Sequence, residues 1–166
     1  MFTSVSEFIG EYRMESNATQ KLLDVLTDES LQRQVGEGYR TLGQLAWHLV
    51  HDDSGMLQRI GLKFQAPPAS AEPPQSAVAI AQAYRTTAAS LLEAAAGWSD
   101  GRLLENNDMF GQQWSNAYTL YAFLKHEIHH RGQLTVLMRQ AGLPVAGMYG
   151  PSKQEWETMG IPAPTK

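Results

Sequence analysis

Apolar residues recur at intervals of three and four positions in four separate stretches of the chain, which is the period of an amphipathic helix. These stretches cover residues 4–26, 41–60, 76–96 and, starting at 115 or 116, a fourth that continues to about 140. Polar residues separate the apolar ones in each stretch, so each helix would have one face to bury against the others.

Local signals mark several of the expected helix ends. "TLGQ", from Thr41 to Gln44, has the form of a capping box, in which the hydroxyl and the amide side chain each satisfy a backbone N–H group. "SKQE", beginning at Ser152, has the same form and predicts a short helix near the C-terminus. Gly97 is a plausible stop for the third helix, and "AGLP" at 141–144 ends the fourth.

The segments between the helices differ in kind. Residues 27–40 carry two glycines in "VGEGYR" and read as a connection, and residues 98–116 suit a short extended hairpin. "KFQAPPASAEPPQS", residues 63–76, contains four prolines and predicts an irregular crossover, because proline lacks the backbone donor. We therefore expect an all-α single domain over residues 1–166: a four-helix bundle with a long crossover between its second and third helices and a short C-terminal helix.

Composition narrows the class of protein further. Hydrophobic residues make up 43% of the 166 positions and the net charge is −4, with no basic run, so nucleic acid is not an expected partner. The absence of cysteine excludes disulfides, cysteine-ligated zinc and a cysteine nucleophile, and agrees with a reducing compartment. Neither a signal peptide nor an apolar run of about 20 residues is present, so we expect a cytoplasmic protein without a membrane partner.

Three of the five histidines fall within residues 126–130. His126 and His130 are one helical turn apart, so their imidazoles can converge, and they share their helix face with Thr119 and Leu137. His129 lies about 100° around the helix from His130 and cannot easily point at the same spot.

The other two histidines lie in the second helical stretch. His48 borders the apolar stripe formed by Leu45 and Leu49, whereas helical periodicity turns His51 roughly 160° from that stripe, toward solvent. If the second and fourth helices are neighbours, His48, His126 and His130 form a cluster of three nitrogens. Histidines at helix edges also serve in packing alone, so spacing does not decide between packing and metal binding.

Three imidazoles without a fourth protein ligand are typical of an open catalytic metal site, where water or substrate takes the remaining position. Such ligands suit Zn²⁺, Ni²⁺, Cu²⁺ or Fe²⁺. A structural site would instead be closed by a fourth ligand, and His51, His129 or Asp52 could supply it if the helical phases differ from those assumed.

Charged residues lie close to the histidines in both helical stretches. Asp52 could accept a hydrogen bond from an imidazole or remain a solvated charge, and Asp53 lies near enough to the apolar stripe to need a partner. Glu127 and Arg131 are spaced for pairing with each other, and their phase on the apolar side of the helix also suits an interhelical role.

Further side chains could line or serve a site. Gln133, Trp47 and Trp114 are candidates for a pocket wall, although aromatic residues at helical spacing more often belong to a core. Proton donors could come from the tyrosines, although the sequence places none of them near the histidines: Tyr118, Tyr121 and Tyr149. No general base is identified.

Three segments, in this order along the chain, resemble the DinB/YfiT-like family: "RTLGQLAWHLVH", "KHEIHHRGQL" and "LPVAGMYGPSKQEW". The opening segment also resembles the first helix of that family, so the resemblance covers nearly the whole chain. It implies a four-helix bundle with a long crossover, often dimeric, and a divalent metal held by three histidines. Those positions match His48, His126 and His130.

The resemblance implies enzymes that use low-molecular-weight thiols, as S-transferases or isomerases. Our first hypothesis is therefore a metal-dependent enzyme, with zinc or nickel favoured, that activates a thiol for transfer to a small electrophile and acts as a homodimer. The alternatives are a metal-dependent hydrolase of a small molecule, and a non-enzymatic, stress-related protein that binds metal or dimerises.

Overall fold

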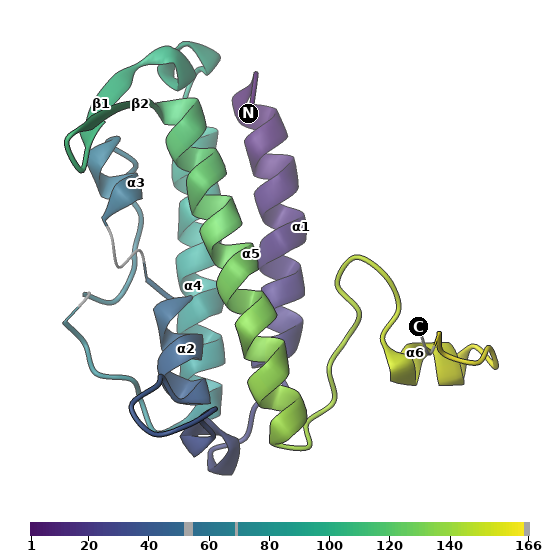
Figure 1. Ribbon diagram of the computed structural model, residues 1–166. Helices are drawn as coiled ribbons and strands as arrows, with labels where there is room; N and C mark the ends of the chain where they lie inside the picture. Colours follow the sequence, from purple (N-terminus) through teal and green to yellow (C-terminus); the bar gives the residue numbers. More distant parts are fainter. Residues whose placement is uncertain (52–54, 69, 165–166) are drawn as a thin grey trace.

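The computed structural model describes residues 1–51, 55–68 and 70–164 of the chain. Three long helices lie side by side: α1 (Val5–Leu23), α4 (Ala77–Ala96) and α5 (Asn116–Gln140). Two short helices, α2 (Leu42–His48) and α3 (Met56–Arg59), follow each other along α5 and together take the place of a fourth helix (Figure 1). The predicted all-α bundle is confirmed.

Side chains in the sequence determine where the helices begin. Ser76 and Ser115 cap α4 and α5, and capping boxes open α1 at Ser4 and α2 at Thr41. The third capping box, at Ser152, opens the short helix α6 (Lys153–Thr158). The apolar faces then meet in one core, whose fully buried members include Phe8, Leu22, Leu42, Ile80, Leu134 and Met138.

The expected second helix, residues 41–60, is wrong in its length. Helix α2 ends at His48, and α3 begins only at Met56, after Gly55 in the left-handed conformation (φ 64°). Asp52, Asp53 and Ser54 lie outside the described residues. Leu49 and Val50, which follow His48, form a turn, and Val50 is fully buried all the same, so the apolar periodicity continues where the helix does not.

The connections also contain regular structure. A 3-10 helix, η1 (Glu29–Gln32), precedes α2, and Gly43 lets α2 approach it, since a Cβ there would lie 3.1 Å from the Cβ of Leu31. A second 3-10 helix, η2 (Asp100–Leu104), precedes an antiparallel hairpin of β1 (Asn106–Met109) and β2 (Gln112–Ser115). The expected hairpin is confirmed, and the proline-rich crossover has no helix or strand among its described residues.

Glu127 and Arg131 lie inside the bundle rather than forming a surface pair. The carboxylate of Glu127 accepts hydrogen bonds from Thr19 (2.7 Å) and from the hydroxyl of Tyr84, and burial raises its pKa. Arg131 forms an ion pair with Glu15 of α1 and also donates to the backbone carbonyl of Glu15 at 2.9 Å. The interhelical role is therefore confirmed: this network joins α5 to α1 and α4.

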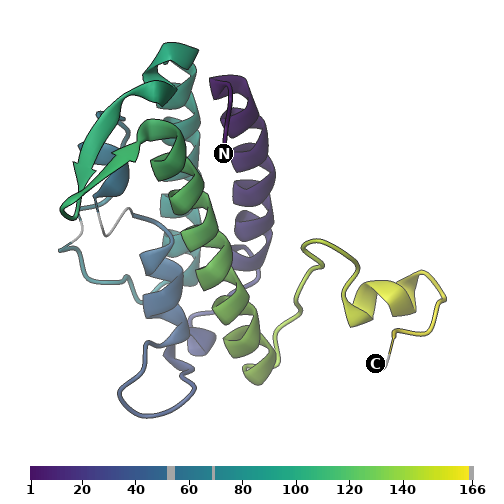
Figure 2. The same cartoon turned by 45° about the horizontal axis from the view of Figure 1, so that its top comes forward.

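The segment after α5 leads away from the bundle. Val145 is buried against the core, and the hydroxyl of Tyr149 donates to Glu15 at 2.9 Å and accepts from Arg131 at 2.7 Å. Helix α6, which has no buried residue, projects beyond this anchor and lies apart from the bundle in both views (Figures 1 and 2). Within the described residues, no helix is both long enough and apolar enough to cross a membrane.

Candidate metal centre

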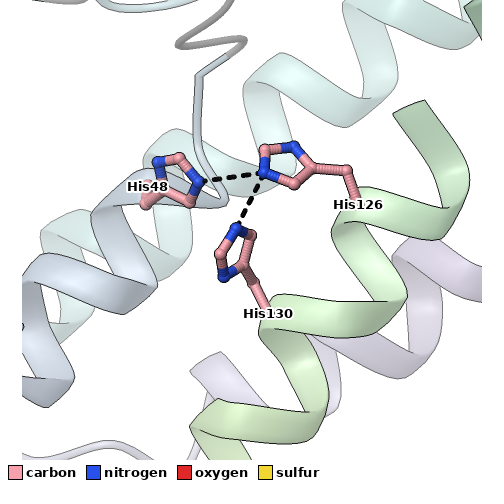
Figure 3. A group of neighbouring side chains, drawn as sticks. All are labelled: His48, His126 and His130. Carbon is pink, nitrogen blue, oxygen red and sulfur yellow. Dashed lines mark hydrogen bonds between the residues drawn. The ribbon is translucent and has the colours of Figure 1, made fainter. Parts of the chain in front are cut away.

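Two helices bring three histidines to one point. His48 is the last residue of α2, and His126 and His130 lie one turn apart on the face of α5 that α2 contacts. All three rings turn their Nε2 edges toward one another across the gap between these helices (Figure 3). The structure thus brings together the three histidines that the sequence singles out.

The distances between the ring nitrogens suit a shared ion. Nε2 of His126 lies 3.5 Å from Nε2 of His48 and 2.8 Å from Nε2 of His130. A tetrahedral zinc ion with bonds of about 2.05 Å would hold its ligand nitrogens about 3.3 Å apart. Among the described residues, these three histidines form the group whose ligand atoms could hold a metal ion, all lying within 4.8 Å of one another.

Gln133 sets the orientation of the most buried of these rings. Its Oε1 lies 2.8 Å from Nδ1 of His130, and its amide nitrogen lies 3.2 Å from Nε2 of His129. The amide oxygen can only accept, so Nδ1 of His130 carries the proton and Nε2 presents its lone pair to the cluster. A metal ligand needs this tautomer, and hydrogen bonds of this kind commonly fix it.

The electrostatic surroundings also favour a neutral ligand at His130. Burial lowers the pKa of His130, the hydrogen bond to Gln133 acts in the opposite direction, and the positive charge of Arg40 adds a smaller lowering effect. Imidazole binds metal only in its neutral form. A lowered pKa therefore favours the form of this ring that can bind a metal ion.

Two pockets are each lined by one histidine of the cluster. The larger, about 670 Å³, is lined mainly by polar residues, including His48, His51, Gln44 and Glu72. The smaller, about 380 Å³, has mainly apolar walls that include Val35, Leu45, Val136 and Leu137, with His130 beside them. The polar pocket gives open space for a small molecule beside His48.

The remaining histidines do not join the cluster. His129 is exposed and contacts Gln133, as its position on the helix predicts. His51 was expected to face solvent, and that expectation is wrong: it is half-buried and lines the polar pocket, with its ring 6.5 Å from that of His48. The helical projection fails because α2 ends at His48. The proposed roles of Asp52 and Asp53 lie outside the described residues.

Of the tryptophans and tyrosines considered for the site, one lines the polar pocket and the others make contacts elsewhere. Trp47 lines the polar pocket and donates its indole N–H to the carbonyl of Ala71 at 2.8 Å. Trp114 packs on Tyr118 at the hairpin, with ring centroids 4.7 Å apart. Tyr121 contacts Lys125 and Phe2, while Tyr149 bonds to the Glu15–Arg131 pair, so these contacts give no support to a tyrosine as proton donor at the cluster.

Sequence reasoning missed Tyr39 and Arg40, which line both pockets. They belong to a loop of residues 35–40 whose base is closed by a β-bridge between Gln34 and Thr41. A signal was present, because Arg40 directly precedes the cap of the helix that carries His48. Its relevance depends on how the loop folds back beside α5, which local sequence does not reveal.

The contact between Gln133 and His130 leads to the first prediction. We expect Gln133→Leu to weaken metal binding about 10- to 100-fold, because His130 loses the acceptor that fixes its tautomer. Gln133→Glu, which keeps an acceptor oxygen, should retain most of the affinity. Competition with a chromophoric chelator measures both, and Gln140→Leu, at an exposed glutamine near the end of α5, is the control. Equal affinity in Gln133→Leu and the control would contradict this role.

Comparison with known proteins agrees with the architecture. The model of the DinB family matches residues 1–165, and the chain belongs to this family. It is similar to the uncharacterized protein YrdA of Bacillus subtilis (strain 168), with 42% identity over 165 residues and 99% of each chain covered.

Two solved structures have the same fold. A crystal structure of a DinB-like protein from Bacillus cereus ATCC 10987 is 43% identical, with a TM-score of 0.85 over 90% of this chain and all of that one. The DinB-like protein YjoA of Bacillus subtilis is 19% identical and has a TM-score of 0.70, over 87% of this chain and 98% of its own. At that identity, the second structure supports the fold alone.

Proposed function

We propose that the protein is a metal-dependent enzyme that transfers the sulfur of a low-molecular-weight thiol to a small electrophile. The observation that carries this proposal is the position of the cluster: three imidazole nitrogens gathered between α2 and α5, with His48 in the wall of an open polar pocket. His48, His126 and His130 would hold a divalent ion, with zinc or nickel the preferred choice.

When bound, the ion would lower the pKa of a thiol, which provides the nucleophile at neutral pH. The reaction balances without an oxidant or reductant: the thiol R–SH loses its proton, sulfur bonds to carbon of R′–X, and X⁻ leaves with the electron pair. Because the chain has no cysteine, the sulfur must come from the cosubstrate. The residues of the chain hold the ion, orient His130 through Gln133 and supply the pocket walls.

The position of the cluster favours an open site over a closed structural one. A structural zinc site has four protein ligands, whereas the group found among the described residues has three, and His48 borders a pocket of about 670 Å³. Hydrolysis by an activated water is the competing activity, and it would need a base near the nitrogens. Glu72 lines the same pocket as His48 and is the described carboxylate that a test of this activity would replace.

The second prediction tests thiol binding directly. Protein loaded with one equivalent of Co²⁺ is expected to develop a new near-ultraviolet charge-transfer band when cysteine, glutathione or 2-mercaptoethanol is added. The same thiol should then react with 1-chloro-2,4-dinitrobenzene, releasing chloride, faster with metal-loaded than with metal-free protein. A spectrum that no thiol changes, together with metal-dependent ester hydrolysis that Glu72→Gln abolishes, would replace the proposal with the hydrolase.

A further inference from the structure

The two pockets at the histidine cluster differ in chemical character. The pocket at His48 is polar, while the groove at His130 is walled by Leu45, Val136 and Leu137, with Val35 at its edge. A site that binds one small polar molecule would need only the polar pocket. The apolar groove, about 380 Å³, has the volume of a small-molecule pocket and ends at a residue of the cluster.

The groove also has a positively charged side chain in its wall, that of Arg40. Arg40 lines both the groove and the polar pocket, and in the groove it shares the wall with His130. The loop that carries Arg40 is held at its base by the Gln34–Thr41 bridge and by a hydrogen bond from the N–H of Leu42 to the carbonyl of Arg33 (2.6 Å). A cation in the wall of an apolar groove complements a molecule with an apolar body and a negative group.

We propose that this groove is the binding site for the electrophile, an apolar molecule, aromatic or branched aliphatic, that bears a negatively charged group. Its body lies against Leu45 and Val136, its charge lies near Arg40, and its reactive carbon faces the cluster. The thiol enters through the polar pocket beside His48. This assignment rests on the proposed function, and it divides the site between two substrates of opposite polarity, with Tyr39 and Arg40 between them.

Two fluorescent probes that differ by one charged group test the assignment. They are 8-anilinonaphthalene-1-sulfonate and its uncharged relative N-phenyl-1-naphthylamine, titrated against full-length metal-loaded protein. Val136→Asp is expected to weaken both by about tenfold or more, since it places a charge in the apolar wall. Arg40→Gln should weaken the sulfonate up to about fivefold, the value of an exposed ion pair, and leave the neutral probe unchanged.

The control variant is Val78→Asp, at an exposed valine on α4, and it should bind both probes as the unmodified protein does. Val136 is itself about half exposed (51%), so aspartate there is compatible with the fold. Equal affinity of Val136→Asp and Val78→Asp would overturn the assignment. The assignment would also be overturned if the affinity for the probes falls as the protein concentration rises and if added probe dissociates dimers. That result would assign the groove to a second copy of this chain.

The two proposals fail separately. Probe binding is measured without thiol, and thiol binding is followed by the Co²⁺ spectrum without probe. Loss of the thiol response with intact, variant-sensitive probe binding overturns the thiol chemistry and leaves the groove as a ligand site. An intact thiol response with probe binding that no groove variant alters overturns the groove assignment alone.

Discussion

Replacement of His126 by alanine is expected to lower the metal content from about one ion per chain to near zero, the largest effect on metal binding that the geometry of the cluster predicts. Nε2 of His126 lies 3.5 Å from Nε2 of His48 and 2.8 Å from Nε2 of His130, and its loss leaves two ligands on different helices. The affinity should fall by more than about 100-fold, which exceeds the cost of losing an outer hydrogen-bond partner. Elemental analysis of protein purified without an affinity tag or added metal, before and after dialysis against metal, measures the change.

The matched control for this variant is His129→Ala, three residues further along the same helix. His129 is exposed and supplies none of the three clustered ligand atoms, although its ring lies beside that of His130 with centroids 5.0 Å apart, so this variant should keep a stoichiometry of about one. Circular dichroism should show the same helix content in both variants, because His126 is only half-buried. Metal retained at one equivalent in His126→Ala, or lost equally in both variants, would mean that the three rings are not the binding site.

Much of the site could be predicted from the sequence because its ligands obey local rules. The helical period places His126 and His130 on one face and turns His129 away, and α5 is a regular helix over its whole length. Ser115 and the "AGLP" segment mark the ends of α5 in the sequence itself. Where a ligand lies in an uninterrupted helix with clear ends, spacing alone gives its direction.

His51 shows where local rules fail. Its direction was derived from a helix that the apolar period extends to residue 60, but α2 ends at His48. Periodicity reports which residues can be buried, and a turn can bury the same residues as well as a helix does. Leu49 and Val50 show this, because they form a turn and Val50 is fully buried all the same.

The pocket walls could not be predicted for a different reason. Tyr39 and Arg40 come from a loop between η1 and α2, and they reach the cluster because the Gln34–Thr41 bridge folds that loop beside α5. Arg131 is similar: its spacing from Glu127 suggests a local pair, but the structure pairs it with Glu15, more than a hundred positions earlier in the chain. Such contacts depend on which helices become neighbours, and a single sequence does not encode that in its spacing.

Arg131→Leu is expected to cost about 3–5 kcal/mol of the free energy of unfolding, the largest stability effect that the structure predicts. The side chains of Arg131 and Glu15 are 2% and 5% exposed, so removing the guanidinium leaves a carboxylate buried without its counter-ion. The hydroxyl of Tyr149, which donates to both carboxylate oxygens, compensates only in part. For a domain of this size the melting temperature should fall by about 10 °C, measured by calorimetry or by denaturant titration.

A second ion pair provides the comparison, because Arg85 of α4 pairs with Asp24 at the end of α1, but at the surface of the bundle. The side chains of Arg85 and Asp24 are 50% and 44% exposed, so Arg85→Leu should cost less than about 1 kcal/mol. The double variant Glu15→Leu with Arg131→Leu should regain part of the stability lost in the single variant, since no buried charge then remains without its partner. If Arg131→Leu and Arg85→Leu cost the same, or if the double variant is the least stable, the buried pair does not hold α5 to α1 in the way its contacts indicate. The cost would then have to come from lost packing around residue 131, because the exposed pair experiences the same change of side chain without the change in solvation.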